Sequence, residues 1–106
     1  MMEEIDVFEL KKIFDSKENF ILLDVRNQDE YDYCKINGSI LIPLPELLLR
    51  FKELDNKKEI VVHCHHGNRS KRAVEFLQTK DFKNLKNLKG GIDEWSKNID
   101  KSVLDY

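Results

Sequence analysis

The stretch EIVVHCHHGNRSKRAVEFL, Glu59–Leu77, joins two apolar segments through a short polar one. Residues 58–64 form a short apolar run, which is typical of a buried strand. From Ser70 onward the apolar residues recur at helical spacing, so a helix is expected to follow. The segment between them, CHHGNR, then forms a connecting loop, in which Gly67 supplies a positive φ without a steric penalty. Strand, loop and helix in this order are the unit of a parallel α/β sheet.

The rest of the chain continues this alternation of strands and helices. Short apolar runs predict strands, and periodic or N-capped runs predict helices. The predicted strands are residues 20–25, 38–44, 58–64 and 83–91, and the predicted helices are residues ~6–15, 27–34, 45–54, 70–80 and 92–98. This pattern predicts an α/β domain with a mostly parallel sheet of four to five strands, covered by helices on both faces. Ligand sites in such sheets lie beyond the carboxyl ends of the strands, where the CHHGNR loop is expected.

Length and composition predict one compact domain spanning residues 1–106 and exclude several classes of function. Of the 106 residues, 41% are hydrophobic and 36% are charged, which suffices for a single modest core. The formal net charge of −2 provides no basic surface for nucleic acid or for a membrane. No apolar run approaches the ~20 residues of a membrane span, and the acidic N-terminus does not resemble a signal peptide. The two cysteines are therefore expected to be reduced, in a cytoplasmic protein.

Cys64 is the candidate nucleophile. The predicted loop wraps over a helix N-terminus, where free N–H groups and the helix dipole favour an anion. The anion most naturally placed there is the Cys64 sulfur, because a thiol beside a helix N-terminus and cations ionises readily. Arg69, Lys71 and Arg72 supply positive charge, and Asn68 is a candidate helix cap. A thiolate formed in this way is a nucleophile without a separate general base.

Two other interpretations of the cluster compete with this one. A cysteine after an apolar strand is often a small buried residue without a chemical role. Four consecutive potential metal ligands are present, but adjacent residues at a strand end point to opposite faces and cannot converge on one ion, so no metal site is expected. These residues are His63, Cys64, His65 and His66. We expect His63 to be a packed neutral side chain, whereas His65 and His66 either face a ligand or are simply exposed.

Three segments together resemble single-domain rhodaneses, which are sulfurtransferases. The first is LLDVRNQDEYDYCKINGSILIPL, residues 22–44, similar to the family's D-V-R, acidic residue, G-H-I-x-G and I-P pattern. The second is VVHCHHGNRSKRA, residues 61–73, similar to its C-x-x-G-x-R-S loop. The third is NLKGGIDEW, residues 87–95, similar to its L-x-G-G-x-x-x-W ending. The likeness covers nearly the whole chain and implies a small three-layer, rhodanese-like fold.

The resemblance implies an enzyme that moves sulfane sulfur from thiosulfate or a persulfide donor to cyanide or a thiol. Cys64 would carry the sulfur as a persulfide, and Arg69 would hold the leaving sulfite or the anionic donor. The loop N–H groups would stabilise the persulfide; the loop consists of His65, His66, Gly67, Asn68, Arg69 and Ser70. Four residues separate Cys64 from Arg69, one fewer than in related phosphatases and arsenate reductases, which favours sulfur over phosphate. The family needs no cofactor and no metal.

Other positions that match the family are expected to be structural. Asp24 and Arg26 match its D-V-R motif, and Glu30 matches its acidic residue. We expect these three to form an ion-pair or hydrogen-bond network that orders the loop after the first strand. The glycine pair of the third segment should form a turn, and Trp95 should belong to the core. Cys34 stands where the family has glycine; it is either a resolving thiol or a semi-buried residue at a helix end.

A second class of function stays open at this point. The chain is alternatively a sulfur-carrier or docking module, loaded by a partner such as a cysteine desulfurase and poorly active on thiosulfate. The partners implied are thus a small anionic sulfur donor or a protein that gives or accepts sulfur. The basic residues near Cys64 favour the enzyme, because they suit anionic donors.

Overall fold

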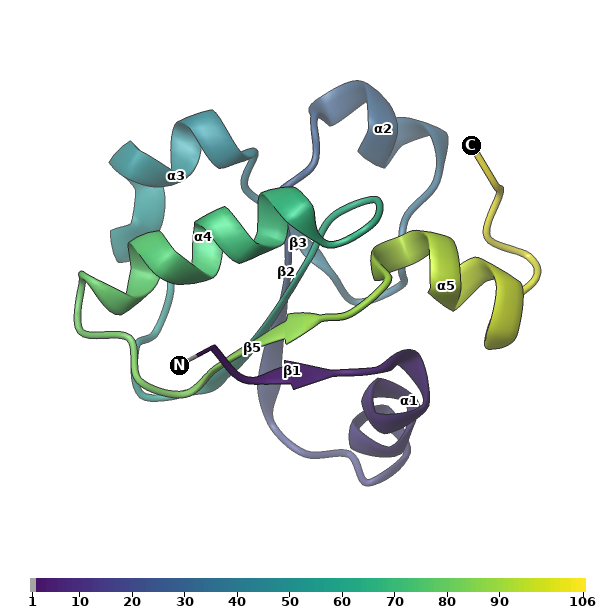
Figure 1. Cartoon of the computed structure of the whole chain (residues 1–106), viewed down its shortest axis with the longest axis horizontal. Coiled ribbons are helices and arrows are strands. Elements are labelled where there is room, and N and C mark those ends of the chain that lie inside the picture. The colour runs from purple at the N-terminus through teal and green to yellow at the C-terminus, as the bar shows by residue number, and fades with distance from the viewer. Residues whose placement is uncertain (1) are drawn as a thin grey trace.

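The computed structural model of the chain describes residues 2–106 and contains one five-stranded sheet with helices on both faces (Figure 1). The sheet has the order β1-β5-β4-β2-β3, and every neighbouring pair of strands is parallel. The strands are β1 Glu4–Ile5, β2 Phe20–Asp24, β3 Ile40–Leu41, β4 Glu59–His63 and β5 Leu85–Leu88. The helices are α1 Val7–Asp15, α2 Gln28–Tyr33, α3 Leu44–Arg50, α4 Asn68–Gln78 and α5 Gly91–Asn98, with a 3-10 turn at Phe51–Glu53. The prediction of an α/β fold with a mostly parallel sheet of four to five strands is confirmed.

The central strand β4 is buried on both faces, which explains the apolar run of residues 60–62. Ile60, Val62 and Cys64 point into a core shared with α3 and α4. Val61 points the opposite way, into a second core shared with α1 and α5. Successive residues of a strand alternate between its faces, so both cores are built from one run of sequence. The carboxyl end of β4 is therefore held firmly from both sides, and the CHHGNR loop begins there.

The sequence-based boundaries differ from the structure at two places near the site. α4 begins at Asn68, two positions before the predicted start at Ser70, so the connecting loop is shorter than expected. The residue that caps α4 is Gly67, with φ of 120°, and not Asn68. Strand β1 was missed because a pair of residues is too short to show alternation. Among residues 2–106, none of the helices is both long and apolar enough to cross a lipid bilayer.

Candidate active site

The Cys64 sulfur lies at the N-terminus of α4, where the backbone donates hydrogen bonds to it. The Gly67 N–H donates to Sγ at 3.1 Å, and the Ser70 N–H donates at 3.4 Å. The thiol lies 3.5 Å from the Ser70 hydroxyl oxygen, and that hydroxyl donates to the Gly67 carbonyl at 3.0 Å. The Cys64 side chain is buried, at 1% exposure. Free N–H groups at the start of a helix are thus directed at a sulfur atom, where they can stabilise negative charge that develops in a reaction.

The first turn of α5 holds the loop in place from the other side. The Ile92 N–H donates to the Cys64 carbonyl at 2.9 Å, and the Asp93 N–H donates to the His65 carbonyl at 3.1 Å. Gly91, with φ of 57°, allows this approach, since a Cβ there would lie 2.4 Å from the Cys64 oxygen and 2.5 Å from the His65 oxygen. The glycine pair expected to form a turn therefore also admits the loop backbone against α5.

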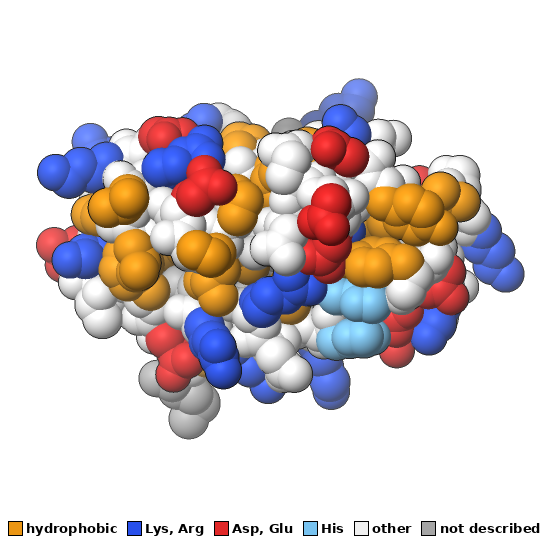
Figure 2. Space-filling view, turned by 90° about the horizontal axis from the view of Figure 1, so that it is seen from above, with side chains coloured by type: hydrophobic (Ala, Val, Ile, Leu, Met, Phe, Trp, Pro, Cys, Tyr) orange, Lys and Arg blue, Asp and Glu red, His pale blue; other side chains and the backbone are white. Residues whose placement is uncertain are grey.

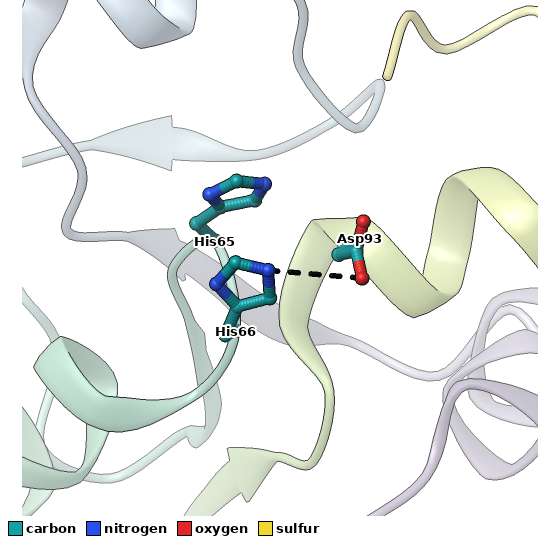
Figure 3. Close-up of side chains that lie close together, drawn as sticks. All are labelled: His65, His66 and Asp93. Atoms are coloured by element: carbon teal, nitrogen blue, oxygen red, sulfur yellow. Dashed lines mark ion pairs between the residues drawn. The ribbon is translucent and has the colours of Figure 1, made fainter. Parts of the chain in front are cut away.

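The three histidines occupy different environments. His63 is fully buried, and burial lowers the pKa of its imidazole, so it is neutral and packed, as expected. His66 is exposed, and the histidine side chains seen in Figure 2 lie together on the surface. The rings of His65 and His66 stack with centroids 3.9 Å apart, and His66 Nε2 lies 3.8 Å from a carboxylate oxygen of Asp93 (Figure 3). The argument from alternating faces therefore does not apply to this pair, which lies beyond the end of β4.

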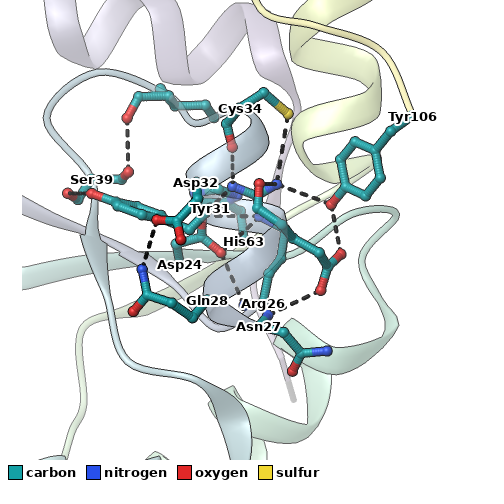
Figure 4. Close-up of polar contacts among 12 residues, drawn as sticks. Asp24, Arg26, Asn27, Gln28, Tyr31, Asp32, Cys34, Ser39, His63 and Tyr106 are labelled. Atoms are coloured by element: carbon teal, nitrogen blue, oxygen red, sulfur yellow. Dashed lines mark hydrogen bonds and ion pairs between the residues drawn. The ribbon is translucent and has the colours of Figure 1, made fainter.

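The predicted network after β2 is present, but its partners differ from the expectation (Figure 4). Arg26 donates to the Asp24 carboxylate through Nε at 3.0 Å and through Nη2 at 2.7 Å, and both side chains are fully buried. Arg26 Nη2 also donates to the Cys34 carbonyl at 2.7 Å. It reaches Glu30 only through the backbone carbonyl, at 3.4 Å from Nη1. Asp24 and Arg26 therefore order the connection from β2 to the end of α2.

The Glu30 carboxylate instead pairs with Arg69 in the first turn of α4. The two distances, Nη1 to Oε1 and Nη2 to Oε2, are 2.6 and 2.9 Å. This bidentate pair is the main reason why the pKa of Glu30 falls to about 2. Both Nη atoms of Arg69 are engaged in this pair, and a role for Arg69 in holding a leaving sulfite stays a prediction. The Glu30–Arg69 pair links α2 to the first turn of α4.

Tyr106 completes the surroundings of the site and was missed by the sequence analysis. Its ring stacks on His65, with centroids 3.9 Å apart and planes within 7°. Its hydroxyl accepts a hydrogen bond from Arg26 Nη1 at 2.9 Å and donates to Glu30 Oε2 at 2.7 Å. A single tyrosine in a segment without periodicity carries no sequence signal for such a contact.

The remaining sequence candidates lie on the surface of α4 or in the two cores. Asn68, Lys71 and Arg72 are exposed on α4. Trp95 is buried in the core beside α1 and α5, as expected. Cys34 caps the C-terminal end of α2 and belongs to that same core, which matches the helix-end alternative. Cys64 belongs to the core on the other face of the sheet.

The central strand of this parallel α/β sheet presents a cysteine sulfur to the N-terminus of the following helix. Domains with this arrangement are suited to sulfur or oxyanion chemistry, because the helix N-terminus stabilises negative charge. Within this class, the sequence model of the rhodanese-like domain matches residues 6–98, and the chain belongs to the rhodanese-like family.

Individual relatives agree with this assignment. The chain is 37% identical to the putative sulfur carrier protein YrkF of Bacillus subtilis, over 88% of this chain and 50% of that protein. It is 28% identical to a sulfurtransferase of Allochromatium vinosum, over 92% of this chain and 91% of that protein. The crystal structure of a rhodanese-related protein from Thermoplasma volcanium superimposes with a TM-score of 0.83 at 35% identity, covering 92% of this chain and 93% of that one. The chain spans between 22% and 50% of the length of the first curated relatives that it matches.

Proposed function

We propose that the protein is a sulfurtransferase that carries sulfane sulfur as a persulfide on Cys64. The observation that carries this proposal is the pair of hydrogen bonds from the Gly67 and Ser70 N–H groups to Cys64 Sγ, at 3.1 and 3.4 Å. These donors are fixed by the first turn of α4, so they need no reorganisation when charge develops on sulfur. The family assignment and the names of the relatives support the same chemistry.

In the first step, the Cys64 thiolate attacks the outer sulfur of the donor. With thiosulfate, a new S–S bond forms to Cys64, the bond between the two sulfurs of the donor breaks, and sulfite leaves with the electron pair. The product is Cys64–S–S⁻, whose negative charge needs the same kind of stabilisation as the thiolate. Losing a single well-placed donor of this type typically removes about 3 kcal/mol of transition-state stabilisation.

In the second step, an acceptor attacks the outer sulfur of the persulfide. Cyanide takes the sulfur to become thiocyanate, a thiolate takes it to become a new persulfide, and the Cys64 thiolate is regenerated. Each step passes one zero-valent sulfur atom from a donor to an acceptor, so no external oxidant or reductant is needed. His63 is buried and neutral, so we assign it no proton transfer in either step.

The alternative is a sulfur carrier that a partner protein loads, with thiosulfate as a poor donor. Two observations support the sulfur-carrier alternative. Arg69 is the residue expected to hold an anionic donor, and its guanidinium is already paired with Glu30. A relative with 37% identity bears the name of a putative sulfur carrier protein. In this version the Cys64 persulfide is the same, and only the donor differs.

Intact-mass spectrometry of the reduced protein separates these possibilities. The protein is incubated with thiosulfate, or with a cysteine desulfurase and cysteine, and then treated with cyanide. We expect a gain of one sulfur atom with thiosulfate, its absence in Cys64→Ala, and its release as thiocyanate. Sulfur gained only from the desulfurase would replace the thiosulfate enzyme with the carrier. Sulfur gained from neither donor would overturn the proposal.

A further inference from the structure

A second cluster of ligand-type side chains lies at the edge of the loop. His65 and His66 come from the loop and Asp93 from the first turn of α5, and one potential ligand atom of each lies within 4.8 Å of the others (Figure 3). In Figure 2 the histidine side chains lie close to acidic side chains on the surface of the molecule. The proposed sulfur chemistry gives this cluster no role.

The cluster is held together by the backbone and not only by its side chains. The Asp93 N–H donates to the His65 carbonyl at 3.1 Å, which fixes α5 beside the loop. Stacking of His65 on Tyr106, at 3.9 Å between centroids, limits the orientations open to the His65 ring. His66 stacks on the outer face of His65. The three ligand groups are therefore close before any ion binds, and binding requires the two stacked imidazoles to turn so that their in-plane nitrogen lone pairs meet at one ion.

One nitrogen of the cluster lacks the partner that a buried polar atom normally has. His65 Nε2 is buried and makes no hydrogen bond to any of residues 2–106. Buried polar atoms are satisfied in the great majority of cases, and an exception indicates an unseen partner such as water or an ion. The Asp93 side chain, the third member of the cluster, is also largely buried, at 14% exposure.

We propose that His65, His66 and Asp93 bind a divalent transition-metal cation of the Zn²⁺ type. Two imidazoles and one carboxylate are ligands that suit Zn²⁺ and its borderline neighbours better than Ca²⁺ or Mg²⁺. Zinc bonds of about 2.0–2.1 Å require the ligand atoms to lie roughly 3.3 Å apart, a small closure of the present cluster. Three protein ligands leave a fourth position open to water or to a sulfur anion.

Lys97 is the competitor of the metal ion. Its ammonium lies 3.1 Å from the Asp93 carboxylate, four residues along α5. A bound cation replaces this exposed ion pair, so removal of Lys97 should strengthen metal binding. A variant that gains affinity cannot owe the gain to misfolding, which makes it a sharp test.

The binding test uses Zn²⁺ itself, titrated into the full chain in competition with a chromophoric chelator. The chain carries Cys34→Ser and Cys64→Ser, so that thiolates do not contribute. Asp93→Asn should weaken binding by about tenfold or more, since losing even an outer partner of a metal ligand costs 10–100-fold. Lys97→Met should tighten binding by about threefold, the worth of an exposed ion pair. Glu94→Gln is the matched control on the next residue of α5, and it should stay within about twofold of the parent, as rim charges are screened.

Equal affinity of the parent and Asp93→Asn overturns the site, and so does an equal loss in Asp93→Asn and Glu94→Gln, which would indicate charge attraction alone. Loss of all binding in the cysteine-free parent assigns the ion to the thiols and also overturns it. None of these outcomes depends on sulfur transfer.

A second readout rests on the proposed function. His65 is the chain neighbour of Cys64, so an ion at the cluster restrains the loop that holds the sulfur. We expect Zn²⁺ to slow sulfur uptake from thiosulfate in the wild-type chain, with the ratio of rates with and without Zn²⁺ closer to one in Asp93→Asn. If the chain takes up no sulfur at all, the sulfurtransferase proposal fails while the chelator titration still decides the metal site.

Discussion

The two cysteines are both buried and unpaired, yet they lie at opposite ends of helices. Cys64, at 1% exposure, precedes the N-terminus of α4 and accepts N–H hydrogen bonds on its sulfur. Cys34, at 8% exposure, follows the C-terminus of α2, and its own N–H donates to the Glu30 carbonyl at 3.0 Å. A helix N-terminus favours negative charge and a C-terminus disfavours it. Burial alone therefore does not distinguish the two thiols, whereas the helix end beside each one does.

A nearby cation does not cancel this difference. Arg26 Nη1 lies 3.9 Å from the Cys34 sulfur, but the same guanidinium is paired with the buried Asp24 carboxylate. Its positive charge is therefore already neutralised. At Cys64 the hydrogen bonds come from backbone N–H groups at the start of α4, whose dipoles are fixed by the helix. The comparison predicts one reactive thiol and one inert thiol in the same chain.

The largest expected effect is on sulfur uptake by the two cysteine variants. Cys64→Ala should lose all sulfur uptake, because the atom that forms the persulfide bond is gone. Cys34→Ala should keep a rate within about threefold of the wild type, because Cys34 belongs to the core on the other face of the sheet from Cys64. Intact mass after thiosulfate or desulfurase treatment measures both. Persistent sulfur on the Cys64→Ala chain, removed by adding Cys34→Ala, would reverse the comparison.

The next effect concerns the glycine that admits the loop against α5. Gly91→Ala places a Cβ 2.4 Å from the Cys64 carbonyl at φ of 57°, so we expect a loss of about 3–5 kcal/mol in unfolding free energy. Gly38→Ala is the matched control, with φ of 90° but its nearest atom 3.8 Å away, and should lose only about 1–2 kcal/mol. Urea denaturation followed by circular dichroism measures both. Equal losses would mean that backbone strain, and not contact with the loop, accounts for Gly91.

The third effect concerns the carboxylate that connects the surroundings of the two cysteines. Glu30→Gln should lower the unfolding free energy at pH 7 by about 2 kcal/mol, since it removes a charged bidentate partner of Arg69. The pKa of Glu30 in the fold is about 2, below its ordinary value of 4.5, because Arg69 and neighbouring donors hold the carboxylate. Its contribution is therefore complete above pH 4.5 and disappears as the pH falls toward 2.

The difference in stability between the wild type and Glu30→Gln should thus shrink across this acid range. Asp29→Asn, on the adjacent exposed residue of α2, is the control and should differ from the wild type by only a few tenths of a kcal/mol, roughly the worth of a charge near a helix N-terminus. Denaturant titrations at several pH values measure all three chains. A constant difference down to pH 2 would show that the pair with Arg69 does not hold the carboxylate charged.

The fold and the position of Cys64 were predictable because both depend on local patterns. β4 contains a short apolar run, α4 has a helical repeat, and Gly67 marks the turn between them. The position of the cysteine at a helix N-terminus follows from that order of elements. A strand over residues 83–91 was also predicted, ending in a glycine turn, and β5 lies within it, although its place between β1 and β4 came only from the structure.

The partners of the charged residues were not predictable, because they come from contacts between distant segments. The resemblance to the family implied that Glu30 joins one network with Asp24 and Arg26, whereas its carboxylate pairs with Arg69 on α4. The contacts of Tyr106 with Glu30 and His65 likewise join parts of the chain far apart in sequence. Rules for helices and strands describe one face of one element, and these contacts form only when several elements pack.

The smallest expected effect concerns Ser70, whose hydroxyl lies beside the Cys64 sulfur. Ser70→Ala removes the hydroxyl 3.5 Å from Sγ and its hydrogen bond to the Gly67 carbonyl, while the Ser70 N–H stays in place. We expect persulfide formation to slow by about fivefold, equivalent to one hydrogen bond of about 1 kcal/mol. Ser96→Ala is the matched control, because its hydroxyl makes the same kind of bond to the Asp93 carbonyl three residues earlier, at 2.9 Å. Both variants should lose similar stability in urea, but only Ser70→Ala should form persulfide more slowly in a quenched intact-mass time course. If both variants react at the wild-type rate, the backbone of α4 alone distinguishes Cys64 from Cys34, and the hydroxyl serves only to hold the first turn.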